Sequence, residues 1–447
     1  MTRANHLLAI YIASVAGSAV LAAEPHRDAW AQWRGPGGSG IAAPADVPLE
    51  WDATTSRNIQ WKTEIEGRGH SSPVVWGDRV FLTTAIEGEV IAGAKAPPHM
   101  MEGEEFKHPD ALGADRRHTL KVIAIDRGTG AVAWSKVAYD GAMYDDRHKA
   151  SSFASPTVAT DGERVFAYFG SPGLYVYDLA GNQLWTRDVG DIKTIGMGVG
   201  TSPVLSAGRV FIQADEDEGK ESFLVALDAR DGKESWRVKR PIQASWTTPV
   251  VVADPAGVEQ LITAGNEQII AYDPASGREL WKVDGLASNA IHVPLHADGM
   301  VFVTAGYPDK VLKALELQPG GKPPRVAWTY NKGIAYVASN LLYEGRVYLT
   351  NDQGVLTCLD AKTGELIYEG GRAPAQGFYM ASLVALGGKI LMINRDGDGG
   401  WVKAGPVHEV LAQNTVDEPV YATPAIVGDR IYIRGERHLF AIAKTAG

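Results

Sequence analysis

The chain has 447 residues, a formal net charge of −10 at pH 7 and 45% apolar residues, with 50 Gly, 24 Pro, 12 Trp and one Cys. The acidic balance argues against nucleic acid or an anionic membrane surface as a partner. The single cysteine, Cys358, excludes an internal disulfide framework. The abundance of Gly, Pro and Trp indicates a globular protein rich in turns.

The N-terminus has the pattern of a secretory signal peptide. Residues 1–23 contain a basic Arg3, an apolar run over 7–22 and small residues before Glu24. A membrane anchor is the alternative, but the run is short for one. We therefore expect a periplasmic or secreted protein with no stable membrane insertion after cleavage. Residues 24–57 are interpreted as an N-terminal arm.

From residue 58 onward the chain repeats one unit. A hydroxyl residue, usually followed by Pro, precedes a short apolar strand, a polar turn and a second strand, as in "TSPVLSAGRVFIQ". All but the first interval between units are 41 to 47 residues long. The unit recurs eight times, with aligned positions at Pro73, Pro156, Pro203, Pro249, Pro294, Asn340, Leu383 and Pro424.

A second pair of strands completes each unit. In "FLVALDARDGKESW" and "IIAYDPASGRELW" an apolar run ends at Asp, Gly follows four residues later, and Trp four residues after that. Asp can accept the turn N–H groups and Gly can supply a positive φ, so the segment predicts a β-hairpin. Four antiparallel strands per unit of about 45 residues predict an all-β, eight-bladed β-propeller.

The chain ends predict how the ring closes. After the eighth strand pair there is a third strand, "HLFAIAK", but no fourth, whereas "NIQWKTEI" at 58–65 is a strand without a unit. This strand can complete the last blade and remove the exposed sheet edges. The propeller is thus predicted over 58–447, with an insertion over 86–118 in the first blade. Its His99, His108 and His118 lack compact metal-ligand spacing, which favours a lid or partner-binding loop.

The "D-x-x-T/S-G-x-x-x-W" hairpins resemble the repeats of the pyrroloquinoline quinone (PQQ)-like eight-bladed propellers. That family includes quinoprotein dehydrogenases and BamB-type scaffolds of outer-membrane assembly, and "WAQWRGPGGSGIA" resembles the lead-in of uncharacterised secreted members. The resemblance implies that one Trp of each fourth strand packs between blades. These residues are Trp61, Trp134, Trp185, Trp236, Trp281 and Trp328.

Equivalent positions around the ring suggest where ligands bind. One residue before the aligned position, a hydroxyl residue occurs in seven of eight units. This regularity indicates a side-chain hydrogen bond that stabilises the fold where the first strand begins. Three residues before it the side chains vary, and four of them form a predicted site for a ligand or partner at the channel mouth. The four are His70, Phe153, Trp246 and Tyr421. Filling of the channel mouth by these side chains is the alternative.

Two loops could hold a cation. In "NRDGDG" the oxygen-bearing Asn394, Asp396 and Asp398 alternate before a Gly, as in Ca²⁺ loops, but the twelfth residue is Gly405 where Glu is expected. A solvated turn is the alternative. The acidic run 215–218 is predicted to be solvated. The mixed charges of "YDDRHKASS" are interpreted as mutual solvation, with proton transfer as the alternative.

A PQQ enzyme needs cations for three carboxylates, a Ca²⁺-type metal and a carboxylate base. The basic residues of the predicted loop face form no cluster in the sequence, and the adjacent cysteines common in the family's enzymes are missing. We therefore expect no cofactor and no catalytic residues. The sequence predicts a monomeric, non-catalytic binding or scaffold protein of the cell envelope, with an envelope protein or glycan as partner. A PQQ-dependent oxidoreductase of alcohols or sugars, with PQQ and Ca²⁺, is the alternative.

Overall fold

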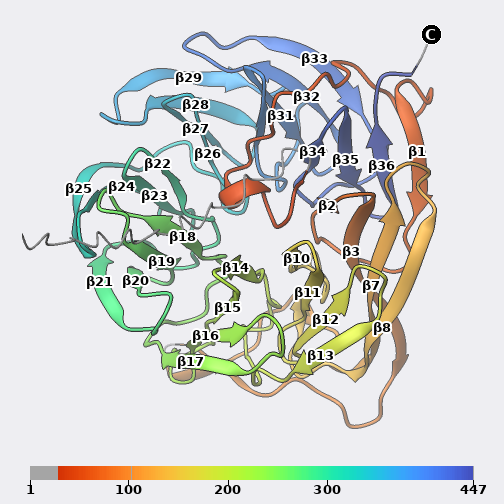
Figure 1. The fold of residues 1–447 in the computed structure, drawn as a ribbon, viewed down its shortest axis with the longest axis vertical. Helices are drawn as coiled ribbons and strands as arrows, with labels where there is room; N and C mark the ends of the chain where they lie inside the picture. The colour runs from red at the N-terminus through yellow and green to blue at the C-terminus, as the bar shows by residue number, and fades with distance from the viewer. Residues whose placement is uncertain (1–28, 102, 446–447) are drawn as a thin grey trace, which may run out of the picture.

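A computed structural model describes residues 29–101 and 103–445, so the predicted signal peptide over 1–23 lies outside the described part. Eight four-stranded antiparallel sheets radiate around a central channel (Figure 1). In the described residues the sole helical element is the 3-10 turn η1 (Pro36–Gly38), and no helix is long and apolar enough to cross a membrane. The predicted all-β, eight-bladed propeller is confirmed.

The blades follow one another in chain order. Blade 1 has β2 (Val74–Trp76), β3 (Arg79–Val90), β7 (Arg116–Asp126) and β8 (Val132–Ala142); blade 2 has β10 (Ala159–Thr160), β11 (Arg164–Tyr168), β12 (Leu174–Asp178) and β13 (Gln183–Arg187); blade 3 has β14 (Val204–Ser206), β15 (Arg209–Ala214), β16 (Phe223–Asp228) and β17 (Glu234–Lys239); blade 4 has β18 (Val250–Ala253), β19 (Glu259–Ala264), β20 (Gln268–Tyr272) and β21 (Glu279–Asp284).

The second half repeats the same order. Blade 5 has β22 (Leu295–Ala297), β23 (Met300–Ala305), β24 (Val311–Gln318) and β25 (Lys322–Tyr330); blade 6 has β26 (Leu341–Tyr343), β27 (Arg346–Thr350), β28 (Val355–Asp360) and β29 (Leu366–Arg372); blade 7 has β30 (Val384–Leu386), β31 (Lys389–Ile393), β32 (Asp398–Lys403) and β33 (Val410–Thr415); blade 8 has β34 (Ala425–Val427), β35 (Arg430–Arg434), β36 (His438–Ile442) and β1 (Ile59–Glu64).

The N-terminal strand closes the ring as predicted. Strand β1 pairs antiparallel with β36, with Trp61 opposite Ala441 and Glu64 opposite His438. The last blade therefore contains strands from both ends of the propeller, which lie side by side in Figure 1. Without β1, the N–H and C=O groups on the outer edge of β36 would be open to pairing with another chain.

Five of the six predicted tryptophans of the fourth strands pack on a glycine of the neighbouring blade, whereas Trp281 donates its indole N–H to Gln260 of its own blade at 2.7 Å. The indole N–H of Trp236 donates to the Pro274 carbonyl at 3.1 Å, and a Cβ on Gly277 would lie 2.6 Å from the Trp236 ring. Gly277 also has φ +73°, so glycine is required there by both space and backbone. The same ring-on-glycine packing occurs in Trp61–Gly130, Trp134–Gly181, Trp185–Gly232 and Trp328–Gly364.

The hydroxyl residues form hydrogen bonds around the channel, and these bonds correct one alignment. A backbone N–H of one blade donates to the hydroxyl of the next, as from Thr423 to Ser72 at 3.1 Å across the ring closure. In blade 2 the acceptor is Thr157. Thr157 therefore corresponds to Ser72. The predicted alignment of Pro156 with Pro73 was wrong by two residues, because β10 begins two residues later than that alignment implies. The bonds are Ser72–Thr157, Thr157–Ser202, Ser202–Thr248, Val293–Ser339, Ser339–Ser382, Ser382–Thr423 and Thr423–Ser72.

The N-terminal arm crosses the central channel, which the sequence did not predict. Trp30 exchanges both backbone hydrogen bonds with Val75 of blade 1, and the segment 40–42 pairs with Ala385 of blade 7. Between these contacts the chain forms η1, which lies at the centre of the ring in Figure 1. Beyond the crossing, the arm packs on blade 7, where Trp51 donates to Asn414, and continues into β1.

Candidate ligand-binding cavity at the channel mouth

A cavity of about 510 Å³ opens at the end of the channel where the chain enters the first strands. Three of the predicted residues, His70, Trp246 and Tyr421, line it. The structure adds residues that were not predicted to lie at the channel mouth, because they belong to other loops or to the arm. These are Trp33, His108, His148, Tyr336, Phe378 and Arg395. The volume is within the range typical of sites for small molecules or for single groups of a larger partner.

His70 and Tyr421 form a stacked pair in the cavity wall. Their ring centroids are 4.3 Å apart and the planes differ by 14°. Burial holds the pKa of His70 well below its usual range, and the charges of Arg68, Arg434 and Arg147 lower it further. The imidazole is therefore neutral at pH 7. Its Nε2 is buried and has no hydrogen-bond partner among the described residues, so its hydrogen-bonding capacity is unused in this arrangement.

Trp246 is held rigidly beside this pair. Its indole N–H donates to the Gly198 carbonyl at 2.8 Å, and its backbone N–H donates to the Ala290 carbonyl at 2.9 Å. The absence of a side chain on Gly200 leaves room for the ring, because a Cβ there would lie 3.1 Å from the Cβ of Trp246. A ring fixed at its N–H offers its flat face for contact at little further cost in conformational entropy.

Phe153 lies elsewhere. It is 7% exposed, stacks edge-on against His118 at 4.6 Å, and is not among the cavity-lining residues. The cause is the two-residue shift in blade 2, which places Ser155 at the position expected for Phe153. The segment "SSFASPTVAT" has hydroxyl residues at several neighbouring positions and therefore gives no local sign of that shift.

A buried histidine between two carboxylates connects the insertion to loops of the propeller. On β4 (His99–Met101), His99 Nδ1 lies 2.8 Å from Asp217 Oδ2, and Nε2 lies 3.0 Å from Asp145 Oδ1. Burial disfavours the charged ring, but the bonds and charges of both carboxylates outweigh it and raise the pKa of His99 to about 9. We call His99, Asp145 and Asp217 the histidine clamp. It joins the insertion to loops of blades 1 and 3 at pH 7.

The acidic run 215–218 is mostly buried, so the prediction of a solvated run was wrong. Besides Asp217 in the clamp, Asp215 forms an ion pair with Arg240 at 3.0 Å, and both side chains are fully buried. Ser245 and Gln213 donate further hydrogen bonds to Asp215, at 2.6 and 2.8 Å. The carboxylates are tolerated inside the protein because each has specific donors.

One group of possible metal ligands converges at the cavity rim: His108, Asp110 and His148, whose ligand atoms lie within 4.8 Å of one another. The pairing of β6 (Ala111–Leu112) with β9 (Arg147–His148) brings them together. Both Nδ1 atoms accept backbone N–H groups at 3.1 Å, which places the protons of the neutral rings on Nε2. Lys149 also lies 3.0 Å from Asp110. A metal would have to break these contacts, so the arrangement fits a hydrogen-bonded rim better than a metal centre.

The loop proposed for Ca²⁺ is built as a turn. The side-chain oxygen of Asn394 accepts the backbone N–H groups of Asp396 and Asp398, at 3.0 and 2.9 Å, and its amide donates to the Gln376 carbonyl at 2.8 Å. These bonds explain the buried Asn394 without a cation, while the side chain of Asp396 is exposed. The local geometry thus favours the alternative of a turn.

The cavity does not fit PQQ. Three carboxylates would need several paired cations, and Arg395 is the only Lys or Arg among the described residues that line the cavity. Asp110 already has Lys149 as its partner, and the oxygen of Asn394 is used by its own turn. We therefore derive no chemistry through this cofactor.

Eight four-stranded blades, Trp–Gly contacts between them and a cavity at one end of the channel define a propeller of the PQQ-repeat class. The sequence family described as outer membrane protein assembly factor BamB matches residues 118–254 and 220–377, together more than half of the chain. The protein belongs to this family.

Individual relatives are distant. Outer membrane protein assembly factor BamB of Burkholderia pseudomallei (strain K96243) is 26% identical over 228 residues, which cover 46% of this chain and 53% of that protein. The match thus spans about half of the curated relative. BamB from Moraxella catarrhalis has a TM-score of 0.55 at 14% identity, covering 81% of this chain and 99% of that one. Quinohemoprotein alcohol dehydrogenase from Comamonas testosteroni has a TM-score of 0.59 at 12% identity, covering 95% and 82%. Both structures show the shared fold alone.

Proposed function

We propose that the protein is a non-catalytic binding protein of the cell envelope that holds a partner protein at the channel mouth. The observation that carries the proposal is the cavity itself, which combines the faces of Trp246 and Tyr421 with the unpartnered Nε2 of His70. Fixed aromatic rings around a polar group are typical of the centre of a binding site. Family membership supports a role in the envelope, and the predicted signal peptide would deliver the chain there.

Site-specific photo-crosslinking tests this proposal. A benzophenone amino acid is placed at Phe378, which lines the cavity, or at Val407, which is 68% exposed on another loop. We expect cells exporting the full chain to give one crosslinked envelope protein from position 378 and none from position 407. Trp246→Ala should abolish that crosslink, while Trp246→Phe, which keeps a flat ring, should retain most of it.

The other outcomes decide against the proposal in distinct ways. Equal crosslinking from both positions would mean that the mouth is not the binding surface. A crosslinked product whose added mass is removed by a muramidase would assign a glycan in place of a protein. Saturable quenching of tryptophan fluorescence by PQQ with Ca²⁺, together with dye reduction driven by alcohols or sugars, would favour the oxidoreductase instead. We expect neither quenching nor dye reduction.

A further inference from the structure

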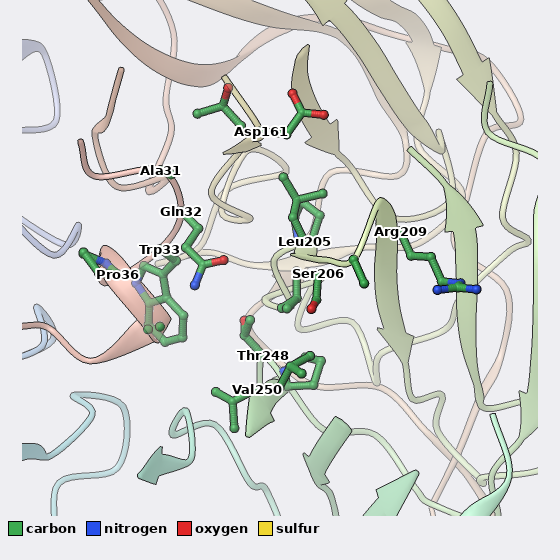
Figure 2. Close-up of a pocket in the computed structure, with 18 of the residues that line it drawn as sticks. Ala31, Gln32, Trp33, Pro36, Asp161, Leu205, Ser206, Arg209, Thr248 and Val250 are labelled. Carbon is green, nitrogen blue, oxygen red and sulfur yellow. The ribbon is translucent and has the colours of Figure 1, made fainter. Parts of the chain in front are cut away.

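The side chain of Trp33 lies between two cavities of the channel. It lines the mouth cavity and also a second cavity of about 520 Å³ on the opposite side of the arm. Figure 2 shows this second cavity, with Gln32, Trp33 and Pro36 of the arm facing Leu205, Thr248 and Val250 of blades 3 and 4. The arm thus places a large ring where an open propeller channel would connect its two ends.

The arm is tied to the ring on both sides of Trp33. On one side Trp30 is 1% exposed and pairs with Val75, and on the other the segment 40–42 pairs with Ala385. Arg34, next to Trp33, is fully buried and donates to four carbonyl groups. Two of these belong to its own turn and two to blades 6 and 7, namely Gly38, Ser39, Asn340 and Leu383.

The backbone around Trp33 allows little adjustment. Arg34 and Gly35 have φ +60° and +67°, and a Cβ on Gly35 would lie 2.6 Å from the Trp30 ring. Any other residue at position 35 would therefore displace Trp30. This tight turn, locked by the Arg34 hydrogen bonds, holds the neighbouring Trp33 ring in the channel.

We propose that Trp33 is the floor of the mouth cavity and sets how deeply a partner can enter it. The mouth cavity, which we call the cup, is then closed at its inner end by Trp33. It accepts one terminal group or side chain of the partner, and no chain passes through the propeller. This inference rests on the proposed function for its biological meaning, but the depth of the cup is a property of the protein alone and can be measured without the partner.

Alkyl chains attached inside the cup can measure its depth. Met380 lines the mouth cavity, and the natural Cys358 is buried, so Met380→Cys in a Cys358→Ala background gives one reactive thiol. Alkyl methanethiosulfonates from methyl to dodecyl attach chains of increasing length. Each methylene that leaves water stabilises the folded state. With Trp33 present, we expect the melting temperature to rise with chain length and then level off well before dodecyl.

Variants at position 33 give the decisive comparison. Trp33→Ala should move the plateau to longer chains, because the chain can then pass into the second cavity, whereas Trp33→Phe should keep the original plateau. Should the alanine variant not fold, Trp33→Leu provides the smaller side chain. A thiol at Val407, far from the cup, should give no plateau shift in any variant. The proposal is overturned if the melting temperature depends on chain length in the same way in the parent and in Trp33→Ala, or in Trp33→Leu where that variant replaces it. This conclusion does not depend on what the crosslinking experiment shows about the partner.

Discussion

The histidine clamp predicts that alkaline pH releases the insertion. The pKa of His99 is raised from 6.5 to about 9 in the folded protein. A group with a raised pKa contributes its full stabilisation below the unfolded pKa and loses it as the pH rises through the folded one. The insertion should therefore be firmly docked at pH 6, still docked at pH 7, and progressively released between about pH 8 and pH 10.

The size of the effect follows from the same shift. At 1.36 kcal/mol for each pKa unit, the shift corresponds to roughly 3 kcal/mol. Allowance for solvent screening and for relaxation of the buried groups reduces the expected loss to about 1–2 kcal/mol, or about tenfold in the docking equilibrium. His99→Gln, which can accept or donate a hydrogen bond but carries no charge, should show that loss already at pH 7 and little further change on alkalinisation.

Limited proteolysis measures the docking directly. Lys95 and Lys107 are exposed in the insertion on either side of β4, so trypsin should cut there whenever the clamp opens. Cleavage of the parent, corrected for protease activity with an unfolded substrate, should rise about tenfold from pH 7 to pH 10. His118→Gln is the control, because burial lowers the pKa of His118 and keeps it neutral throughout this range. An equal rise in His99→Gln would refute the clamp.

Three further predictions concern the blades. Gly277→Ala should cost about 1–2 kcal/mol more stability than Gly345→Ala in urea unfolding, because both have positive φ but only Gly277 faces a ring; equal losses would contradict the Trp–Gly contact. Asp215→Asn should cost about 3–5 kcal/mol, since it leaves Arg240 buried without its counter-charge, whereas Glu218→Gln, at an exposed pair, should change little. Deleting residues 24–65 should cause aggregation through the open edge of β36, and a truncated chain that melts unchanged as a monomer would contradict closure by β1.

The sequence by itself determined the repeated parts of this protein. The Asp, Gly and Trp spacing encodes a hairpin whose turn, ring and backbone requirements are local. Its recurrence, together with eight copies of the preceding strand pair, determined the number of blades. Closure was also predictable, because the unmatched strand with Trp61 and the incomplete last unit are complementary. Trp246, Tyr421 and His70 line the cavity because their positions recur at a constant offset from the first strands. That they bind a ligand or partner stays a prediction.

Only the tertiary structure decided the parts that depend on contacts between distant segments. The two-residue shift in blade 2, which exchanges Phe153 for Ser155, is visible only in the hydrogen bonds between blades. His99 meets Asp217 across 118 positions of sequence, and the arm carries Trp33 into a channel formed by other blades. A repeated sequence pattern predicts the hairpins that it forms locally. The burial of a single charge or ring depends on which distant segments pack against it, and a local sequence pattern does not predict those contacts.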